Sequence, residues 1–123
     1  MISIEEYNAY CKTLPASVCS IQWGGAHVWK VAGKKVFGIA GWSAEDHPYV
    51  TFKVSPESYE VMKSQPGLRP APYLASRGMK WIQMTSVATL SIDDLKIYLA
   101  ESHRLASLNL SKKLQKELGL NQD

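Results

Sequence analysis

The chain has 123 residues, a length that one hydrophobic core normally serves, so we expect a single domain over residues 1–123. Its composition, 46% hydrophobic and 20% charged, is that of a folded globular protein and excludes an intrinsically disordered one. A formal net charge of +3 is mildly basic and excludes a polybasic arm.

The first half of the chain predicts one helix followed by an antiparallel meander. Ser3 and Glu6 form the capping pattern of a helix start, an apolar stripe at spacings of three and four follows, and Pro15 ends the helix. From residue 18 the chain changes to short runs rich in Val, Ile, Trp, Phe and Thr, which turn signals separate. These runs predict four antiparallel strands at about 18–23, 26–31, 35–42 and 49–54.

The second half of the chain predicts mainly helices. Ser55 and Pro56 are typical of a helix start, and Pro66 ends that helix. The remaining elements are a structured loop over 68–78, a fifth strand over 80–85, a long helix from Ser91 and a short final helix between Ser111 and Gly119. Central strands with helices at both ends favour an α+β fold, in which helices cover one face of a single antiparallel sheet of about five strands.

The sequence also bears on the cellular location. No run approaches the ~20 consecutive apolar residues of a membrane span, and the N-terminus lacks the basic start and apolar core of a signal peptide. We therefore expect a cytoplasmic protein that does not associate with a membrane. Cys11 and Cys19 fit two reduced thiols in that compartment, and a disulfide between them is the alternative.

No pattern in the sequence nominates an enzyme. The glycines lie in or between the predicted strands rather than in a phosphate-binding loop that leads into a helix. The three histidines are dispersed without the spacing of metal ligands, and the paired carboxylates of the helix starts stabilise helix dipoles. We therefore expect a non-enzymatic protein with no cofactor and no metal ion.

Charge is distributed unevenly along the chain. Between residues 61 and 92 there is no acidic residue, while Lys63, Arg69, Arg77 and Lys80 supply four positive charges. An uncompensated basic segment of this kind is suited to an anionic partner.

The alternation of the predicted strands adds further cations to this region. Lys30, Lys53 and Trp81 are expected to point away from the core. An uncovered sheet face would then combine lysine, arginine and indole groups, which favour a phosphate backbone and stacked bases. Two other interpretations stay open, namely an ordinary solvated face and a Trp81 side chain that packs under a loop.

Several segments resemble, in the right order, those of the MmcQ/YjbR family of small bacterial proteins. The most specific is the segment 66–74, Pro-Gly-Leu-Arg-Pro-Ala-Pro-Tyr-Leu, which Lys80 and Trp81 follow. The dipeptide Trp23-Gly24 and the hairpin over residues 28–37 also fit. The resemblance implies a fold similar to that of frataxin and CyaY, with helices on one side of an antiparallel sheet.

The same resemblance implies a function. Family members are commonly described as DNA-binding, because the sheet and its hairpins are similar to a double-wing DNA-binding module. Carried over to this sequence, it implies a nucleic-acid-binding surface formed by Lys30, Lys35, Lys53, Arg69, Tyr73, Lys80 and Trp81.

Two alternatives concern the segment around Arg69. One is a binding module for a protein partner or a small anionic ligand, in which Arg69 and Lys80 meet a carboxylate or phosphate beside Tyr73 and Trp81. The other is a purely structural loop in which Arg69 bonds to loop carbonyls. The oligomeric state stays open.

The likeness to frataxin also raises the question of iron. Frataxin-type iron binding relies on an acidic ridge along the first helix. Here that helix offers only Glu5 and Glu6 before Lys12. Because hard cations need several converging carboxylates, we expect no iron site.

Overall fold

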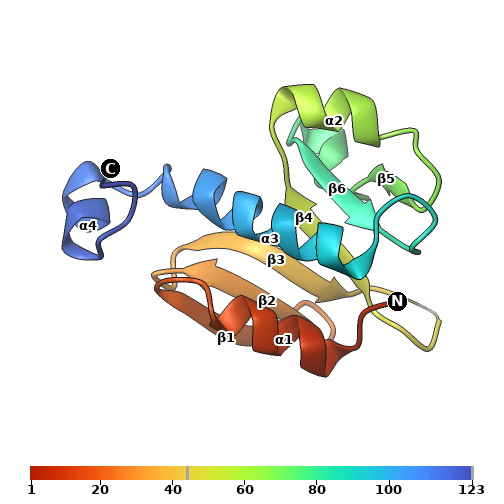
Figure 1. Ribbon diagram of the computed structural model, residues 1–123, viewed down its shortest axis with the longest axis horizontal. Coiled ribbons are helices and arrows are strands. Elements are labelled where there is room, and N and C mark those ends of the chain that lie inside the picture. The colour runs from red at the N-terminus through yellow and green to blue at the C-terminus, as the bar shows by residue number, and fades with distance from the viewer. Residues whose placement is uncertain (44, 123) are drawn as a thin grey trace.

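A computed structural model, which describes residues 1–43 and 45–122, places helices on one side of a six-stranded antiparallel sheet (Figure 1). The strands are β1 (Ser17–Gln22), β2 (Ala26–Val31), β3 (Lys35–Gly41), β4 (Tyr49–Lys53), β5 (Leu68–Pro70) and β6 (Trp81–Met84). The helices are α1 (Ile4–Lys12), α2 (Pro56–Met62), α3 (Ile92–Ser107) and α4 (Lys112–Glu117), with a 3-10 turn η1 (Ala75–Arg77). The predicted α+β class with one antiparallel sheet is confirmed.

The sheet contains one strand more than expected. Its order is β1-β2-β3-β4-β6-β5, so the three-residue strand β5 lies at the edge next to β6. Leu68 pairs with Met84, and Arg69 pairs with Gln83. Three residues are too few to show a strand alternation, and Pro70 argues against a strand except at an edge. The expected loop over 68–78 therefore begins as a strand.

Each α-helix begins at a serine that the sequence indicates as its cap. Ser3, Ser55, Ser91 and Ser111 all lie in extended backbone and accept a hydrogen bond from the amide three residues further on. At Ser91 the bond is reciprocal, since the Asp94 carboxylate accepts from the Ser91 amide. The predicted helix starts are confirmed, because capping depends on neighbouring residues alone.

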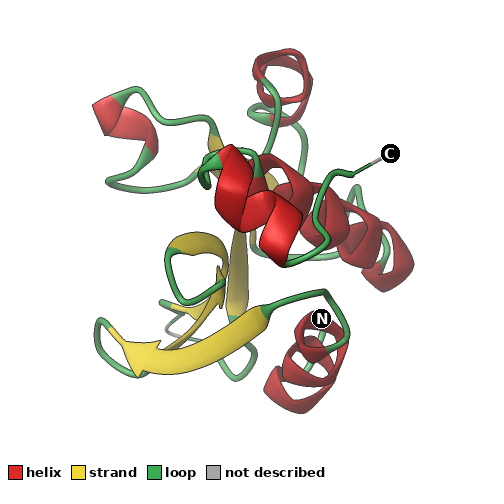
Figure 2. Cartoon of the chain, turned by 90° about the vertical axis from the view of Figure 1, so that its left-hand side faces the viewer, coloured by secondary structure: helices red, strands yellow, loops and turns green. Residues whose placement is uncertain are grey.

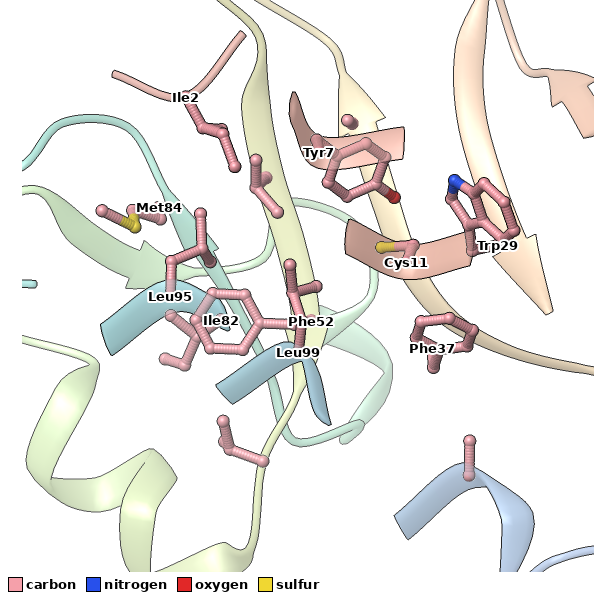
Figure 3. Close-up of a cluster of buried hydrophobic side chains, with 14 of the residues drawn as sticks. Ile2, Tyr7, Cys11, Trp29, Phe37, Phe52, Ile82, Met84, Leu95 and Leu99 are labelled. Atoms are coloured by element: carbon pink, nitrogen blue, oxygen red, sulfur yellow. The ribbon is translucent and has the colours of Figure 1, made fainter. Parts of the chain in front are cut away.

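Helices α1 and α3 lie on the same side of the sheet (Figure 2). The core between them and the strands contains Tyr7 of α1, Phe37 and Phe52 of the sheet, and Leu95 and Leu99 of α3, all fully buried (Figure 3). The face of the sheet toward the helices is thereby closed.

Both cysteines are free. Cys11 is buried in the core, and burial raises the pKa of its thiol well above its usual range. Cys19 is half-buried, and burial raises the pKa of its thiol as well. Both groups are therefore protonated thiols at neutral pH, which are poor nucleophiles.

Within residues 1–43 and 45–122, no helix is both long and apolar enough to cross a membrane. In the same part of the chain, His, Cys, Asp and Glu side chains nowhere gather in a group of three that could hold a metal ion.

Candidate ligand-binding pocket on the open face of the sheet

The side of the sheet away from α1 and α3, here called the pocket face, carries a continuous row of side chains. Val28 lies opposite Ile39, Ile39 opposite Thr51, Thr51 opposite Gln83, and Gln83 opposite Arg69. Residues that lie opposite each other in antiparallel strands share a face. The row thus changes from aliphatic on β2 and β3 to polar and cationic on β4, β6 and β5.

The alternation of the strands had suggested a bare sheet face, but the pocket face is partly covered. Residues 71–80, which include η1, fold over it, and Leu74 packs on the small cluster of Ala26, Val28 and Ile39. Trp81 is only 5% exposed and Thr51 only 1%. Trp81 therefore points away from the helical core as expected, but it is covered, which is the alternative in which it packs under a loop.

Between this segment and the sheet lies a cavity of about 950 Å³ that opens to solvent. Its walls are mostly apolar, with aromatic side chains from Trp23, Trp42, Tyr73 and Trp81. The polar side chains that line it are Arg69, Arg77 and Gln83. Small-molecule sites commonly have volumes of about 300–1,000 Å³, apolar walls and a few placed polar groups.

Three of the aromatic residues are held in a strained backbone conformation. Trp23, Trp42 and Tyr73 have φ angles of 50°, 57° and 71°, in the left-handed region that bulky residues rarely adopt. They are three of the six such non-glycine residues in the described chain. Strain of this kind concentrates at functional sites, because it persists only where the surroundings enforce it.

Two of the tryptophans that line the pocket, Trp23 and Trp42, contact each other. Each directly follows a strand, Trp23 after β1 and Trp42 after β3. The indole N–H of Trp42 donates to the Trp23 carbonyl at 3.1 Å, and the ring centroids lie 6.1 Å apart with a tilt of 37°. Trp23 stays 53% exposed and Trp42 40%, so the pair is positioned but not buried.

Arg69 is held in place by a neutral group. Its Nε and Nη2 donate to the side-chain oxygen of Gln83 at 2.8 and 2.5 Å. The Gln83 amide nitrogen in turn donates to the Thr51 hydroxyl at 3.3 Å, and both of these side chains are buried. The guanidinium also lies over the Tyr49 ring at 5.6 Å. Gln83 thus orients Arg69 without neutralising its charge.

Carboxylates do not compensate the cations of the pocket. Neither Asp nor Glu occurs among the described residues that line it, and none of the ion pairs found in residues 1–43 and 45–122 includes Arg69 or Arg77. Arg77 lies over the Tyr73 ring at 5.6 Å and donates to its hydroxyl at 3.5 Å. The pocket therefore combines apolar walls with two positive charges.

Of the seven residues suggested from sequence, Arg69, Tyr73 and Trp81 come together in the pocket. Lys30 and Lys53 lie on the pocket face but do not line the cavity, and Lys53 is opposite Trp81 in the strand register. These five positions share one side of the molecule.

The other two suggested residues lie elsewhere. Lys80 is stacked over the ring of Tyr59 in α2, with its Nζ 4.8 Å from the ring centroid. Lys35 is exposed at the start of β3, opposite the core residue Val31. Neither side chain belongs to the pocket.

Among the polar and aromatic residues that line the pocket, the site suggested from sequence did not include Trp23, Trp42, Arg77 and Gln83. Two of them carried a signal in the sequence. Arg77 lies in the basic segment that lacks acidic residues, and Gln83 is two residues after Trp81 in a strand and therefore shares its face. The two tryptophans lie far apart in sequence, and only the meander of the strands brings them together.

Comparison with known proteins supports the resemblance seen in the sequence. The model of the YjbR family matches residues 12–105, more than half of the chain. The crystal structure of Deinococcus radiodurans protein DR2400, described with a DUF419 domain, is similar with a TM-score of 0.81 and 25% identity, covering 98% of this chain and 90% of that one. No curated protein matches the chain. Motif, fold and family match agree, and the chain belongs to the YjbR family.

Proposed function

We propose that this protein is a non-enzymatic binding module whose pocket takes a small anion with an apolar body. The observation that carries the proposal is the state of Arg69, whose guanidinium is oriented by the neutral Gln83 amide and faces no carboxylate in the described part of the pocket. An arginine with a purely structural role is commonly paired with an acid or with backbone carbonyls, and among residues 1–43 and 45–122 Arg69 has neither partner.

The surroundings of Arg69 support an anion with an apolar body rather than a free inorganic ion. The walls are aromatic and aliphatic, so an apolar group gains free energy by leaving water there. Arg69 is itself exposed to solvent, so that an entering anion reaches it without rearrangement of the sheet. Charge-assisted hydrogen bonds to a guanidinium contribute about 1.5–3 kcal/mol each.

The proposal is tested with two fluorescent probes that differ in charge. 8-Anilinonaphthalene-1-sulfonate (ANS) carries a sulfonate, and N-phenyl-1-naphthylamine (NPN) lacks it. Arg69→Met should lower the affinity for ANS about tenfold or more and leave that for NPN within about twofold, because only the charged contact is lost.

The matched control is Lys80→Met, which removes one positive charge outside the pocket. It should leave the binding of both probes unchanged. The proposal is wrong if Arg69→Met has no effect on ANS, or if Lys80→Met lowers ANS binding by the same factor.

A second candidate function is nucleic-acid binding, which the family resemblance implies. It is favoured by Lys30 and Lys53 on the pocket face and by the exposed rings of Trp23, Trp42 and Tyr73, which offer stacking surfaces beside cations. Labelled single-stranded and duplex DNA are titrated at about 50 and 200 mM salt, since phosphate contacts make affinity fall steeply with salt. Absence of binding at the lower salt, or full binding by the Lys30→Ala/Lys53→Ala variant, removes this candidate.

A further inference from the structure

We infer that the ligand of the pocket is a planar aromatic carboxylate, held by the outer end of the Arg69 guanidinium and packed against the indole rings. This inference rests on the proposed function and adds the chemical class of the ligand to it. The hydrogen-bonding geometry of Arg69 and the aromatic lining each support one half of the inference.

The hydrogen bonds of Arg69 determine which part of the guanidinium a ligand can reach. The group has five N–H donors in a rigid planar fork, and Gln83 accepts one from Nε and one from Nη2. The three that remain are two on Nη1 and one on Nη2, and no side chain or backbone group in residues 1–43 and 45–122 accepts from them.

Two of these remaining donors are parallel and lie at the outer end of the fork. A carboxylate presents two oxygens in one plane at a spacing that matches such a pair of N–H groups, so it can bind in a bidentate manner. Buried Gln83 and Thr51 fix the orientation of the plane, which lowers the entropy that Arg69 loses on binding. The site therefore favours a planar anion over a spherical one.

The aromatic lining supports a flat ring system as the body of the ligand. The rings of Trp23 and Trp42 are tilted to each other rather than stacked, and both side chains keep a large exposed surface. Tyr73, which is 72% exposed, adds a third ring from the segment 71–80. Exposed rings held by a strained backbone gain most from a partner that stacks on them.

The experiment displaces ANS from the full chain with three competitors of similar size. 2-Naphthoate is the aromatic carboxylate, 2-naphthamide is its neutral analogue, and decanoate is an aliphatic carboxylate. We expect 2-naphthoate to displace ANS at a concentration at least tenfold lower than either of the others.

Each other result overturns a definite part of the argument. If decanoate displaces ANS equally well or better, the ligand is not an aromatic one. If 2-naphthamide displaces ANS equally well, the ligand need not be a carboxylate. In both cases the binding of ANS itself still supports the proposed function. If ANS does not bind the native protein at all, the proposed function fails and this inference fails with it.

A variant tests the role of the rings independently. Trp23→Leu keeps an apolar side chain at an exposed position, so it should leave the fold intact. It should lower the affinity for 2-naphthoate about fivefold or more, because the naphthalene ring loses a stacking partner. The affinity for decanoate should stay within about twofold. An equal loss for both competitors contradicts the stacking of an aromatic body.

Discussion

Gln83 determines, at the scale of single residues, what Arg69 can do. A glutamate at this position would hold the guanidinium in the same place through the same oxygen but would cancel its charge. The neutral Gln83 amide attracts Arg69 less strongly than a carboxylate would, and it leaves the positive charge of Arg69 available to another group. Thr51 secures this arrangement by accepting from the Gln83 nitrogen.

Gln83→Glu therefore tests the pocket without removing Arg69. We expect the affinity for ANS to fall about tenfold or more and the affinity for NPN to stay within about twofold, because a buried carboxylate beside Arg69 neutralises the charge that the sulfonate needs. Probe titration measures both. Gln65→Glu, which introduces the same charge outside the pocket, should bind ANS like the native protein, and a loss as large as that of Gln83→Glu would contradict the interpretation.

At the scale of elements, the turn between α2 and β5 brings Arg69 to the pocket. Gly67 has a φ of 77°, and its carbonyl accepts the Thr85 amide at 2.8 Å, which joins this turn to the end of β6. A Cβ atom at Gly67 would lie 2.5 Å from the Ser86 hydroxyl oxygen and 2.9 Å from the Ser86 carbonyl oxygen. The close approach of two backbone segments therefore requires glycine here.

Gly67→Ala should destabilise the protein by about 2–4 kcal/mol, since backbone strain is added to a steric conflict with a backbone atom. Gly33→Ala is the matched control, because Gly33 also has a positive φ but open space around it. Its cost should be only about 1–2 kcal/mol, the strain of the left-handed conformation alone. Urea unfolding measures both, and equal losses would show that the Ser86 contact carries no cost.

At the scale of the whole molecule, α3 connects segments that are distant in sequence. Its Ser102 hydroxyl donates to the Phe37 carbonyl of β3 at 2.7 Å and accepts from the Lys53 amide of β4 at 2.8 Å. One residue further on, the ring of His103 donates from Nε2 to the Pro15 carbonyl at 2.7 Å. The helix thereby fixes the central strands and the segment after α1.

We expect His103 to make the stability of the fold dependent on pH. Burial lowers the pKa of His103 below its ordinary value near 6.5, and the bond to the Pro15 carbonyl opposes this only in part. The unfolded chain therefore binds more protons than the folded one just below pH 6.5, so the free energy of unfolding should fall as the pH drops from about 7 through the folded pKa.

Thermal unfolding at several pH values between 5 and 7 measures this effect. His103→Gln, whose amide can still donate to the Pro15 carbonyl, should lack this part of the pH dependence while its stability at neutral pH changes little. A variant with the same slope as the native protein would show that another group titrates in this range.

Much of the fold could be predicted from the sequence, because it depends on neighbouring residues. The serine caps, the alternation of β4 and the turn signals of the meander each act over a few positions, and the structure confirms the helices and strands that they indicate. The α+β class follows from their order. Edge strand β5 escaped prediction since it is three residues long and contains a proline, and it forms only because β6 is present to pair with it.

The pocket, like the fold, was predictable from the sequence only in part. From sequence alone, Arg69, Tyr73 and Trp81 could be placed in one candidate site, and the lack of acids around them was evident. Only the tertiary structure decided that Lys80 stacks on Tyr59, that residues 71–80 cover Trp81, and that Trp23 and Trp42 line the same cavity. The physical reason is that local sequence determines charge and which side of a strand a residue takes, whereas the contents of a cavity depend on how segments that are far apart in the chain pack together.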